Sequence, residues 1–160
     1  MILPFNPVHL DRLYPNLMRV IRRRVDYWGL DTVRKGFALS AHASTLVIGG
    51  EVLACVAVAQ VRPGVGSLSG LFHKDAKRLH FDALDEAARM FLGSLREHTG
   101  LRAVFTDAYE RVPASGGWLS SLGFRPHGPR YVEPAAPGER LTLCQGWAKM
   151  LVEGEPCLSH

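Results

Sequence analysis

Apolar residues recur every three or four positions through the first part of the chain, which is the spacing of one face of an amphipathic helix. These positions are Leu10, Leu13, Leu17, Ile21, Val25 and Trp28. Pro15 lies inside the stretch and predicts a break into two helices, because proline lacks the backbone N–H that a helix interior needs. Gly29 predicts the end of the second helix, and a further helix is expected over 31–41 with Asp31 as its N-cap.

The pattern then changes to that of extended strands. A β-branched run at 44–48 is followed by Gly49-Gly50, a dipeptide suited to the positive φ angles of a tight hairpin turn. The next run, 52–61, is apolar on both alternating faces, which is typical of a strand covered on both sides at the centre of its sheet. With another strand at 67–73, these segments predict an antiparallel meander, and a short first strand is expected at 2–5.

The clearest helix of the sequence covers 81–99, where the apolar positions form one face and Gly100 is placed to end it. The later segments read as a strand at 101–107, a short helix at 114–122, and strands at 124–132 and 140–147. This order predicts an α/β (α+β) protein with a mixed sheet and helices on both faces. We expect one domain, made of an N-terminal helical segment (1–43), an α/β core (44–150) and a loose tail (151–160).

The composition is that of a globular protein, with 47% apolar and 21% charged residues and a formal net charge of +4. Three cysteines without short spacing argue against a disulfide framework and a zinc site, and Cys55 in an apolar run is expected in the core. The longest apolar run, 52–59, is too short to span a bilayer, so we expect no membrane partner. These features predict a protein of the reducing cytoplasm.

One local motif adds to the order of the elements. Segment 117–124 reads GWLSSLGF: Trp118 and Leu122 lie on an apolar helical face, Gly123 supplies a left-handed turn, and Phe124 begins a strand facing the core. Together with the element order over 44–147, this motif resembles the GNAT (Gcn5-related N-acetyltransferase) superfamily. The resemblance implies a mixed, mostly antiparallel sheet.

Within that superfamily the chain is most similar to a degenerate group encoded by bacteriophages and prophages, which includes a podovirus internal virion protein. In that group a basic, glycine-poor stretch precedes the long helix, as the segment LFHKDAKR at 71–78 does here. This similarity implies a virion-associated protein with virion or host proteins as partners.

The GNAT resemblance implies that an enzyme of this fold holds the pyrophosphate of acetyl-coenzyme A on a glycine-rich loop before the long helix. The corresponding stretch, 73–80, contains no glycine. Lys74, Lys77 and Arg78 are the residues there that can attract phosphate by charge. They are the candidate ligands for acetyl-coenzyme A.

The resemblance also implies a general acid, usually a tyrosine, at the position that Leu119 occupies, and a base on the meander strands. Glu51 is expected to be a solvated turn residue, so His73 is the nearest candidate base on the third meander strand. Tyr109 follows the strand ending at Asp107, at the point where two strands of the GNAT fold splay apart. These two side chains can therefore line a cleft, with Tyr109 as a second catalytic candidate, and the alternative is a polar strand-to-helix loop.

The densest basic cluster lies in the N-terminal helical segment. Arg19, Arg22 and Arg23 share one helix face at positions i, i+3 and i+4, opposite the apolar stripe. Such a face suits a protein partner or a nucleic-acid backbone.

Three functional hypotheses remain open. Three features are missing: the glycines of the cofactor loop, the tyrosine at position 119 and a carboxylate on the third meander strand. Their absence from the sequence favours a non-catalytic, virion-associated structural or binding protein with a GNAT fold. The alternative is an acetyl-coenzyme A-dependent N-acetyltransferase with an atypical cofactor loop, because acyl transfer can proceed largely through positioning. A small nucleic-acid-binding protein that uses the N-terminal arginines is a weaker alternative.

Overall fold

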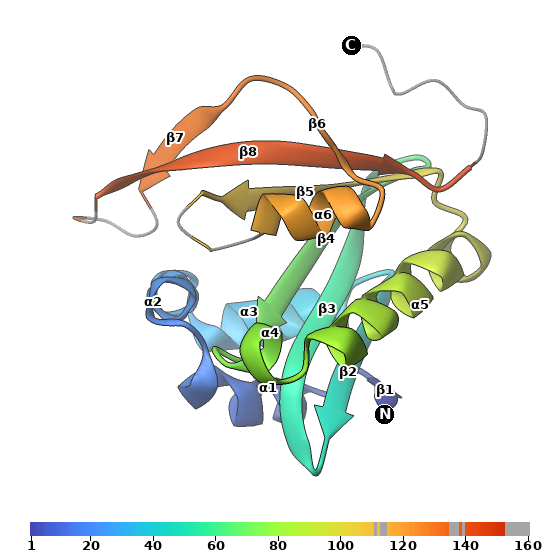
Figure 1. Cartoon of the computed structure of the whole chain (residues 1–160). Coiled ribbons are helices and arrows are strands. Elements are labelled where there is room, and N and C mark those ends of the chain that lie inside the picture. The colour runs from blue at the N-terminus through green and yellow to red at the C-terminus, as the bar shows by residue number, and fades with distance from the viewer. Residues whose placement is uncertain (111, 113–114, 135–137, 139, 153–160) are drawn as a thin grey trace.

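A mixed eight-stranded sheet runs through the part of the chain that the computed structural model describes, residues 1–110, 112, 115–134, 138 and 140–152 (Figure 1). Its strands are β1 Ile2–Pro4, β2 His42–Ile48, β3 Glu51–Arg62, β4 Val65–Phe72, β5 Ala103–Tyr109, β6 Arg125–Pro126, β7 Tyr131–Pro134 and β8 Leu141–Met150. The helices are α1 Pro7–Leu13, α2 Arg19–Trp28, α3 Leu30–Ala38, α4 Ala76–Leu79, α5 Phe81–Thr99 and α6 Ser115–Ser121, with a 3-10 turn at Tyr14–Asn16. Across these residues, no helix has the length and apolar character of a membrane span.

The strand order is β1-β2-β3-β4-β5-β8-β6, with β7 also paired to β8. Every neighbouring pair is antiparallel except β4 with β5, which is parallel. The prediction of a mixed, mostly antiparallel sheet is therefore confirmed, and β3 lies between β2 and β4 as its two apolar faces indicate.

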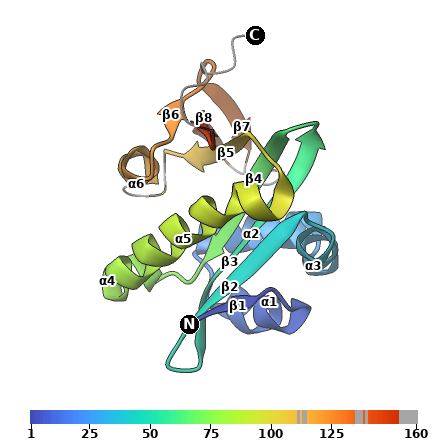
Figure 2. The same ribbon diagram turned by 90° about the vertical axis from the view of Figure 1, so that its right-hand side faces the viewer.

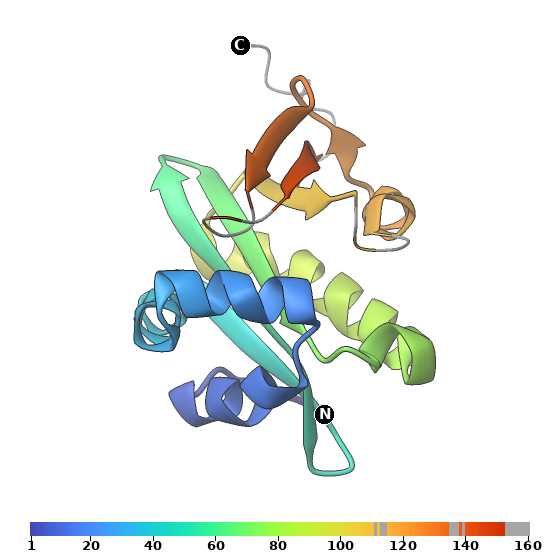
Figure 3. The same cartoon turned by 90° about the vertical axis from the view of Figure 1, so that its left-hand side faces the viewer.

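Helices cover both faces of the sheet (Figures 2 and 3), and an apolar core lies beneath them on each face. Leu95 of α5 and Trp118 of α6 pack on one face, whereas Val25 of α2 and Phe37 of α3 pack on the other. Alternate residues of β3 enter the two cores, for example Val58 the first and Ala57 the second. The N-terminal helices thus belong to the same packed unit as the sheet.

Proline and glycine residues end several helices and strands at the positions that the sequence predicts. Helix α1 stops before Pro15, and α2 starts again at Arg19. Helix α5 covers 81–99 as predicted and ends on Gly100, whose φ of 68° is left-handed. The hairpin at Gly49-Gly50 has positive φ at both residues.

Several predicted boundaries were wrong. Helix α3 begins at Leu30 with Gly29 at its N-cap position, and Asp31 lies in the first turn, where it pairs with Lys35. The segment 124–132 is not one strand, because a turn with positive φ at Gly128 separates β6 from β7. The stretch 73–80, predicted as a loop, contains α4. Most of the predicted tail, 153–160, lies outside the described residues.

Two stacked histidines link β2 to α5 and make the stability depend on pH. The rings of His42 and His98 lie 5.0 Å apart, and His42 also stacks on Phe91 at 5.1 Å. Burial, and secondly the charge of His98, lower the pKa of His42 from its ordinary 6.5. As the pH falls through 6.5, His42 binds a proton in the unfolded chain but stays neutral in the folded chain. The free energy of unfolding therefore decreases until the pH passes the lowered pKa of His42 in the folded chain.

We expect the free energy of unfolding to fall by less than about 1 kcal/mol between about pH 7.5 and about pH 5.5 through this group, because the His42 ring is partly solvated. Urea unfolding of the parent and of His42→Phe at both pH values measures the difference. The phenylalanine keeps a ring against Phe91 and removes the titration. An equal acid-side loss in both proteins would assign the effect to other groups.

Candidate active site

The parallel pair of strands is short, and beyond it the sheet opens. β4 and β5 pair only from Val65 with Ala103 to Ser67 with Phe105. Beyond these residues β4 continues to Phe72 paired with β3, and β5 continues to Tyr109 paired with β8. The two strands therefore separate toward their carboxyl ends.

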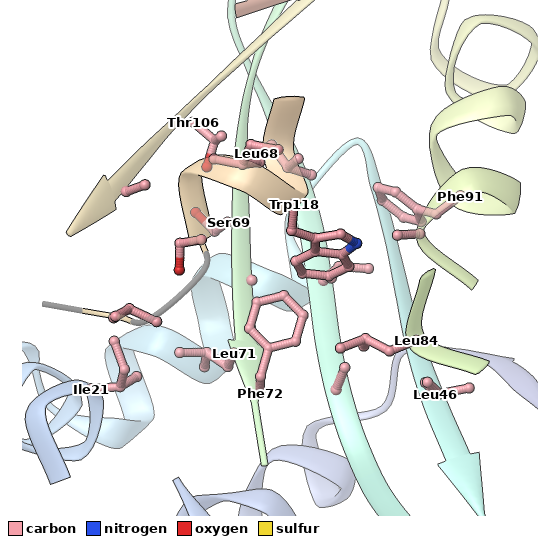
Figure 4. A pocket seen from close by; sticks show the side chains of 18 of the residues that line it. Ile21, Leu46, Leu68, Ser69, Leu71, Phe72, Leu84, Phe91, Thr106 and Trp118 are labelled. Atoms are coloured by element: carbon pink, nitrogen blue, oxygen red, sulfur yellow. The ribbon is translucent and has the colours of Figure 1, made fainter. Parts of the chain in front are cut away.

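A cavity of about 560 Å³ occupies this opening (Figure 4). Inside it, Trp118 of α6 and Phe72 of β4 meet edge to face, with ring centroids 5.7 Å apart. Its lining includes Phe91 of α5 on one face of the sheet and Ile21 of α2 on the other. Because the strands are apart, the cavity reaches both faces.

Strand alternation assigns the residues of β5 to these two sides. Val104 packs in the core under α5 and α6, so Ala108 faces the same side. Asp107 and Tyr109 face the opposite side, where the guanidinium of Arg24 on α2 lies 4.9 Å from the centre of the Tyr109 ring. All four of Arg24, Asp107, Ala108 and Tyr109 line the cavity.

A lysine marks the side of α5 and α6. Lys77 donates from Nζ to Oγ of Ser115 at 3.3 Å, and its ammonium lies 5.1 Å from the centre of the Trp118 ring. Burial lowers the pKa of Lys77. The described residues provide no carboxylate in an ion pair with Lys77, so this half-buried cation faces the cavity without a countercharge.

The other two predicted cofactor ligands are placed differently. Lys74 is exposed and lines the cavity at the end of β4, where its backbone N–H donates to the carbonyl of Asn16 at 2.8 Å. Arg78 points away from the cavity lining and pairs with Asp75 at 3.0 Å. That pairing lowers the pKa of Asp75. The structure therefore brings Lys74 and Lys77 together and leaves Arg78 outside.

His73 is held by both of its ring nitrogens. The backbone N–H of Asp75 donates to Nδ1 at 3.1 Å, and Nε2 lies 3.1 Å from a carboxylate oxygen of Glu51. The bonded Nδ1 must be an acceptor, so Nε2 carries the proton and donates a hydrogen bond to Glu51. Only 8% of His73 is exposed. His73 also lines the cavity, and its role as a base stays a prediction. The contact makes Glu51 a partner of His73, in addition to being a turn residue.

A polar cluster marks the opposite side of the cavity. The hydroxyl of Tyr109 donates to a carboxylate oxygen of Glu133 at 2.9 Å, and Arg24 pairs with the same oxygen at 3.1 Å. Asp107 accepts a hydrogen bond from Tyr131, whose pKa is raised by burial first and then by this bond. Tyr109 and Asp107 thus lie beside a cleft, as predicted, and each has a fixed partner.

The register of three strands assembles this cluster. Tyr109 of β5 and Tyr131 of β7 both lie opposite Cys144 of β8. Sequence reasoning missed Tyr131 and Glu133, because no local pattern reports which residues of β7 face β5 across β8. It also missed Arg24, for which a signal exists: Arg24 follows Ile21 by three positions and so belongs to the inner stripe of α2.

The remaining predicted residues lie apart from the cavity or lack the expected chemistry. Arg19, Arg22 and Arg23 are exposed on α2 and do not line the cavity, so their role in partner binding stays a prediction. Leu119 of α6 lines the cavity at the position where the resemblance implies a tyrosine. Cys55 is buried, as predicted, and burial raises its pKa to about 11.

Comparisons of the sequence find no match to this chain, whereas comparison of its fold with solved structures does. No known family model matches the chain, and no curated protein matches its sequence. Solved structures do match. The ribosomal-protein-S18-alanine N-acetyltransferase from Escherichia coli is 17% identical, with a TM-score of 0.71 over 100% of this chain and 99% of that one.

Two further structures have the same architecture. A putative acetyltransferase from Salmonella typhimurium, solved with its cofactor acetyl-CoA, is 11% identical, with a TM-score of 0.72 over 100% of this chain and 98% of that one. A GNAT-family acetyltransferase from Streptococcus pneumoniae is 17% identical, with a TM-score of 0.67 over 95% and 99%. The chain therefore has the GNAT fold, and the phage and virion part of the resemblance finds no support in these structures.

Proposed function

We propose that this protein is an acetyl-coenzyme A-dependent N-acetyltransferase, the alternative that the sequence left open, and not a non-catalytic virion component. The observation that carries the proposal is the opening between β4 and β5, with a cavity that reaches both faces of the sheet. Two reactants that enter from opposite faces meet in such an opening, and holding them together supplies much of the rate enhancement of a group transfer.

Charge indicates which reactant takes which face. The side of α5 and α6 carries Lys77, and Lys74 lies just beyond the end of β4, whereas the side of α2 carries Asp107 and the Glu133–Arg24 pair. A cofactor with phosphate groups suits the first side and is repelled by the Asp107 carboxylate on the second.

The residues on the α5 and α6 side fit the cofactor. The cavity volume of about 560 Å³ lies within the usual range for small-molecule sites. Lys77, which forms no ion pair with a described carboxylate, would hold a phosphate, and Leu68, Phe72 and Trp118 would line the uncharged part of the cofactor and exclude water. Bound acetyl-coenzyme A supplies an acyl group activated as a thioester. Leu119 has no proton to donate, so this chain relies on positioning in the opening.

Titration calorimetry with acetyl-coenzyme A tests the proposal. We expect Lys77→Ala to weaken binding about tenfold, since a partly desolvated charge-assisted contact is worth about 1.5 kcal/mol. Arg78→Ala is the matched control: it removes the same charge from the same segment, but from a side chain that is 69% exposed and already paired with Asp75. We expect its affinity to stay within about twofold of the parent, because exposed ion pairs contribute little.

Absence of binding by the parent protein would overturn the proposed function. Equal weakening by both substitutions would mean that the cofactor responds to the general charge of segment 73–80 and not to a cation placed inside the cavity.

A further inference from the structure

The α2 side of the opening combines an apolar wall with one carboxylate, that of Asp107, which pairs with no cationic side chain that the structure describes. Four cavity-lining residues on the inner face of α2 and in the turn before it form most of the wall: Met18, Ile21, Val25 and Trp28. Leu71 of β4 continues it, and Figure 4 shows Ile21 and Leu71 next to each other at the cavity. The polar end of this wall is Asp107 with Tyr109.

The carboxylates of this side differ in their charge balance. Glu133 is neutralised by Arg24 and receives the Tyr109 hydroxyl on the same oxygen. Asp107 makes no ion pair with a described cationic side chain and accepts a bond from the neutral Tyr131 hydroxyl. A carboxylate has about four acceptor positions, so Asp107 keeps capacity for a ligand. The side therefore presents one negative charge beside an apolar surface.

We propose that Asp107, oriented by Tyr131, binds and deprotonates the acceptor amine, and that the acceptor is a small monocationic amine on an apolar or aromatic body. This inference rests on the proposed function. A polyamine needs further carboxylates along a wall that is apolar here. A free amino acid needs a cation to bind its carboxylate. Arg24 already pairs with Glu133, so it does not supply that cation.

The proton balance follows from the arrangement. The acceptor arrives as an ammonium ion, and Asp107 takes one proton and passes it to solvent, which leaves a neutral amine. The C–N bond forms as the C–S bond of the bound thioester breaks, and the second amine proton leaves with the thiol. Tyr131 is a positioning residue, since its hydroxyl donates to Asp107 and so orients the carboxylate.

Phenethylamine, spermidine and a short peptide with a free N-terminus are the probes, with thiol release from acetyl-coenzyme A as the assay. We expect kcat/KM to be at least about tenfold higher for phenethylamine than for either of the other probes, which is about 1.4 kcal/mol of discrimination. Asp107→Asn should lower that value by about 100-fold at neutral pH, the usual contribution of a general base. Its rate should recover as the pH rises and the amine deprotonates by itself.

Glu110→Gln is the matched control, because Glu110 lies one residue beyond β5, is exposed and pairs with Arg130 outside the cavity. It should leave the rate unchanged. Tyr131→Phe should show a smaller loss than Asp107→Asn, with a shifted acid limb of the pH profile. A merely structural role of Tyr131 would change stability without shifting that limb.

Direct binding separates the two proposals. NMR titration with phenethylammonium alone should show binding to the parent that weakens about tenfold in Asp107→Asn, as expected for loss of a charge-assisted contact. If acetyl-coenzyme A does not bind but this contrast holds, the proposed function fails and the amine site stands. If the cofactor binds, a preference for spermidine or the peptide, no transfer to any probe, or an unaffected Asp107→Asn overturns the amine-site inference alone.

Discussion

Replacing Ala108 by tryptophan should abolish measurable binding of acetyl-coenzyme A while the protein stays folded. Ala108 lies on β5 beyond Phe105, the last residue that pairs with β4, and it lines the cavity on the side of α6. An indole at this position occupies the opening between the strands. We expect the affinity to fall by more than about 100-fold, which corresponds to about 2.7 kcal/mol of lost binding free energy.

A control separates blocking from general disturbance of the sheet. Val61 near the end of β3 is 61% exposed and lies outside the cavity, so Val61→Trp adds the same ring where it fills nothing. Calorimetry measures the affinity of both variants for acetyl-coenzyme A, and thermal unfolding shows whether each variant stays folded. If Ala108→Trp binds as the parent does, the cofactor does not use the opening, and the proposed function loses the observation that carries it.

Much of the fold follows from local sequence. The apolar period and Gly100 define both ends of α5, and Pro15 separates α1 from α2, because these residues restrict the backbone irrespective of their neighbours. The division of 124–132 into β6 and β7 was not predictable in this way. Both strands pair with β8, so their register depends on a distant segment.

The candidate site was predictable only in outline. Asp107 and Tyr109 were expected beside a cleft from the resemblance, and the structure places them there. Their partners Tyr131 and Glu133 come from another strand and could not be found from local spacing. His73 illustrates the same limit, since no local pattern shows that contacts from Asp75 and Glu51 occupy both of its ring nitrogens.

The sequence favoured a non-catalytic protein because particular residue types are missing, and the structure changes the weight of that argument. A missing glycine loop or tyrosine removes one way of holding the cofactor or protonating the thiolate. It leaves unchanged the separation of β4 and β5, on which the meeting of two reactants depends. Lys77, with no ion-pair partner among the described carboxylates, offers a different way of holding an anion.

Leu119→Tyr should accelerate acyl transfer, because it restores a proton donor at the cavity wall. Leu119 lies on α6, lines the cavity and is partly exposed, so the larger ring can be accommodated. A phenol with a pKa of about 10 can protonate the departing thiolate. We expect kcat with phenethylamine to rise by about 100-fold, the lower range for general acid catalysis, with the KM for acetyl-coenzyme A changed little.

Leu119→Phe is the matched control, since it adds the ring without the hydroxyl. A gain in the tyrosine variant alone, lost at a pH above the phenol pKa, would show that thiolate protonation limits the parent enzyme. Equal rates in both variants would contradict the prediction. In that case the thiolate leaves without help, and the leucine is no handicap to a protein that works by holding its reactants together in the opening of the sheet.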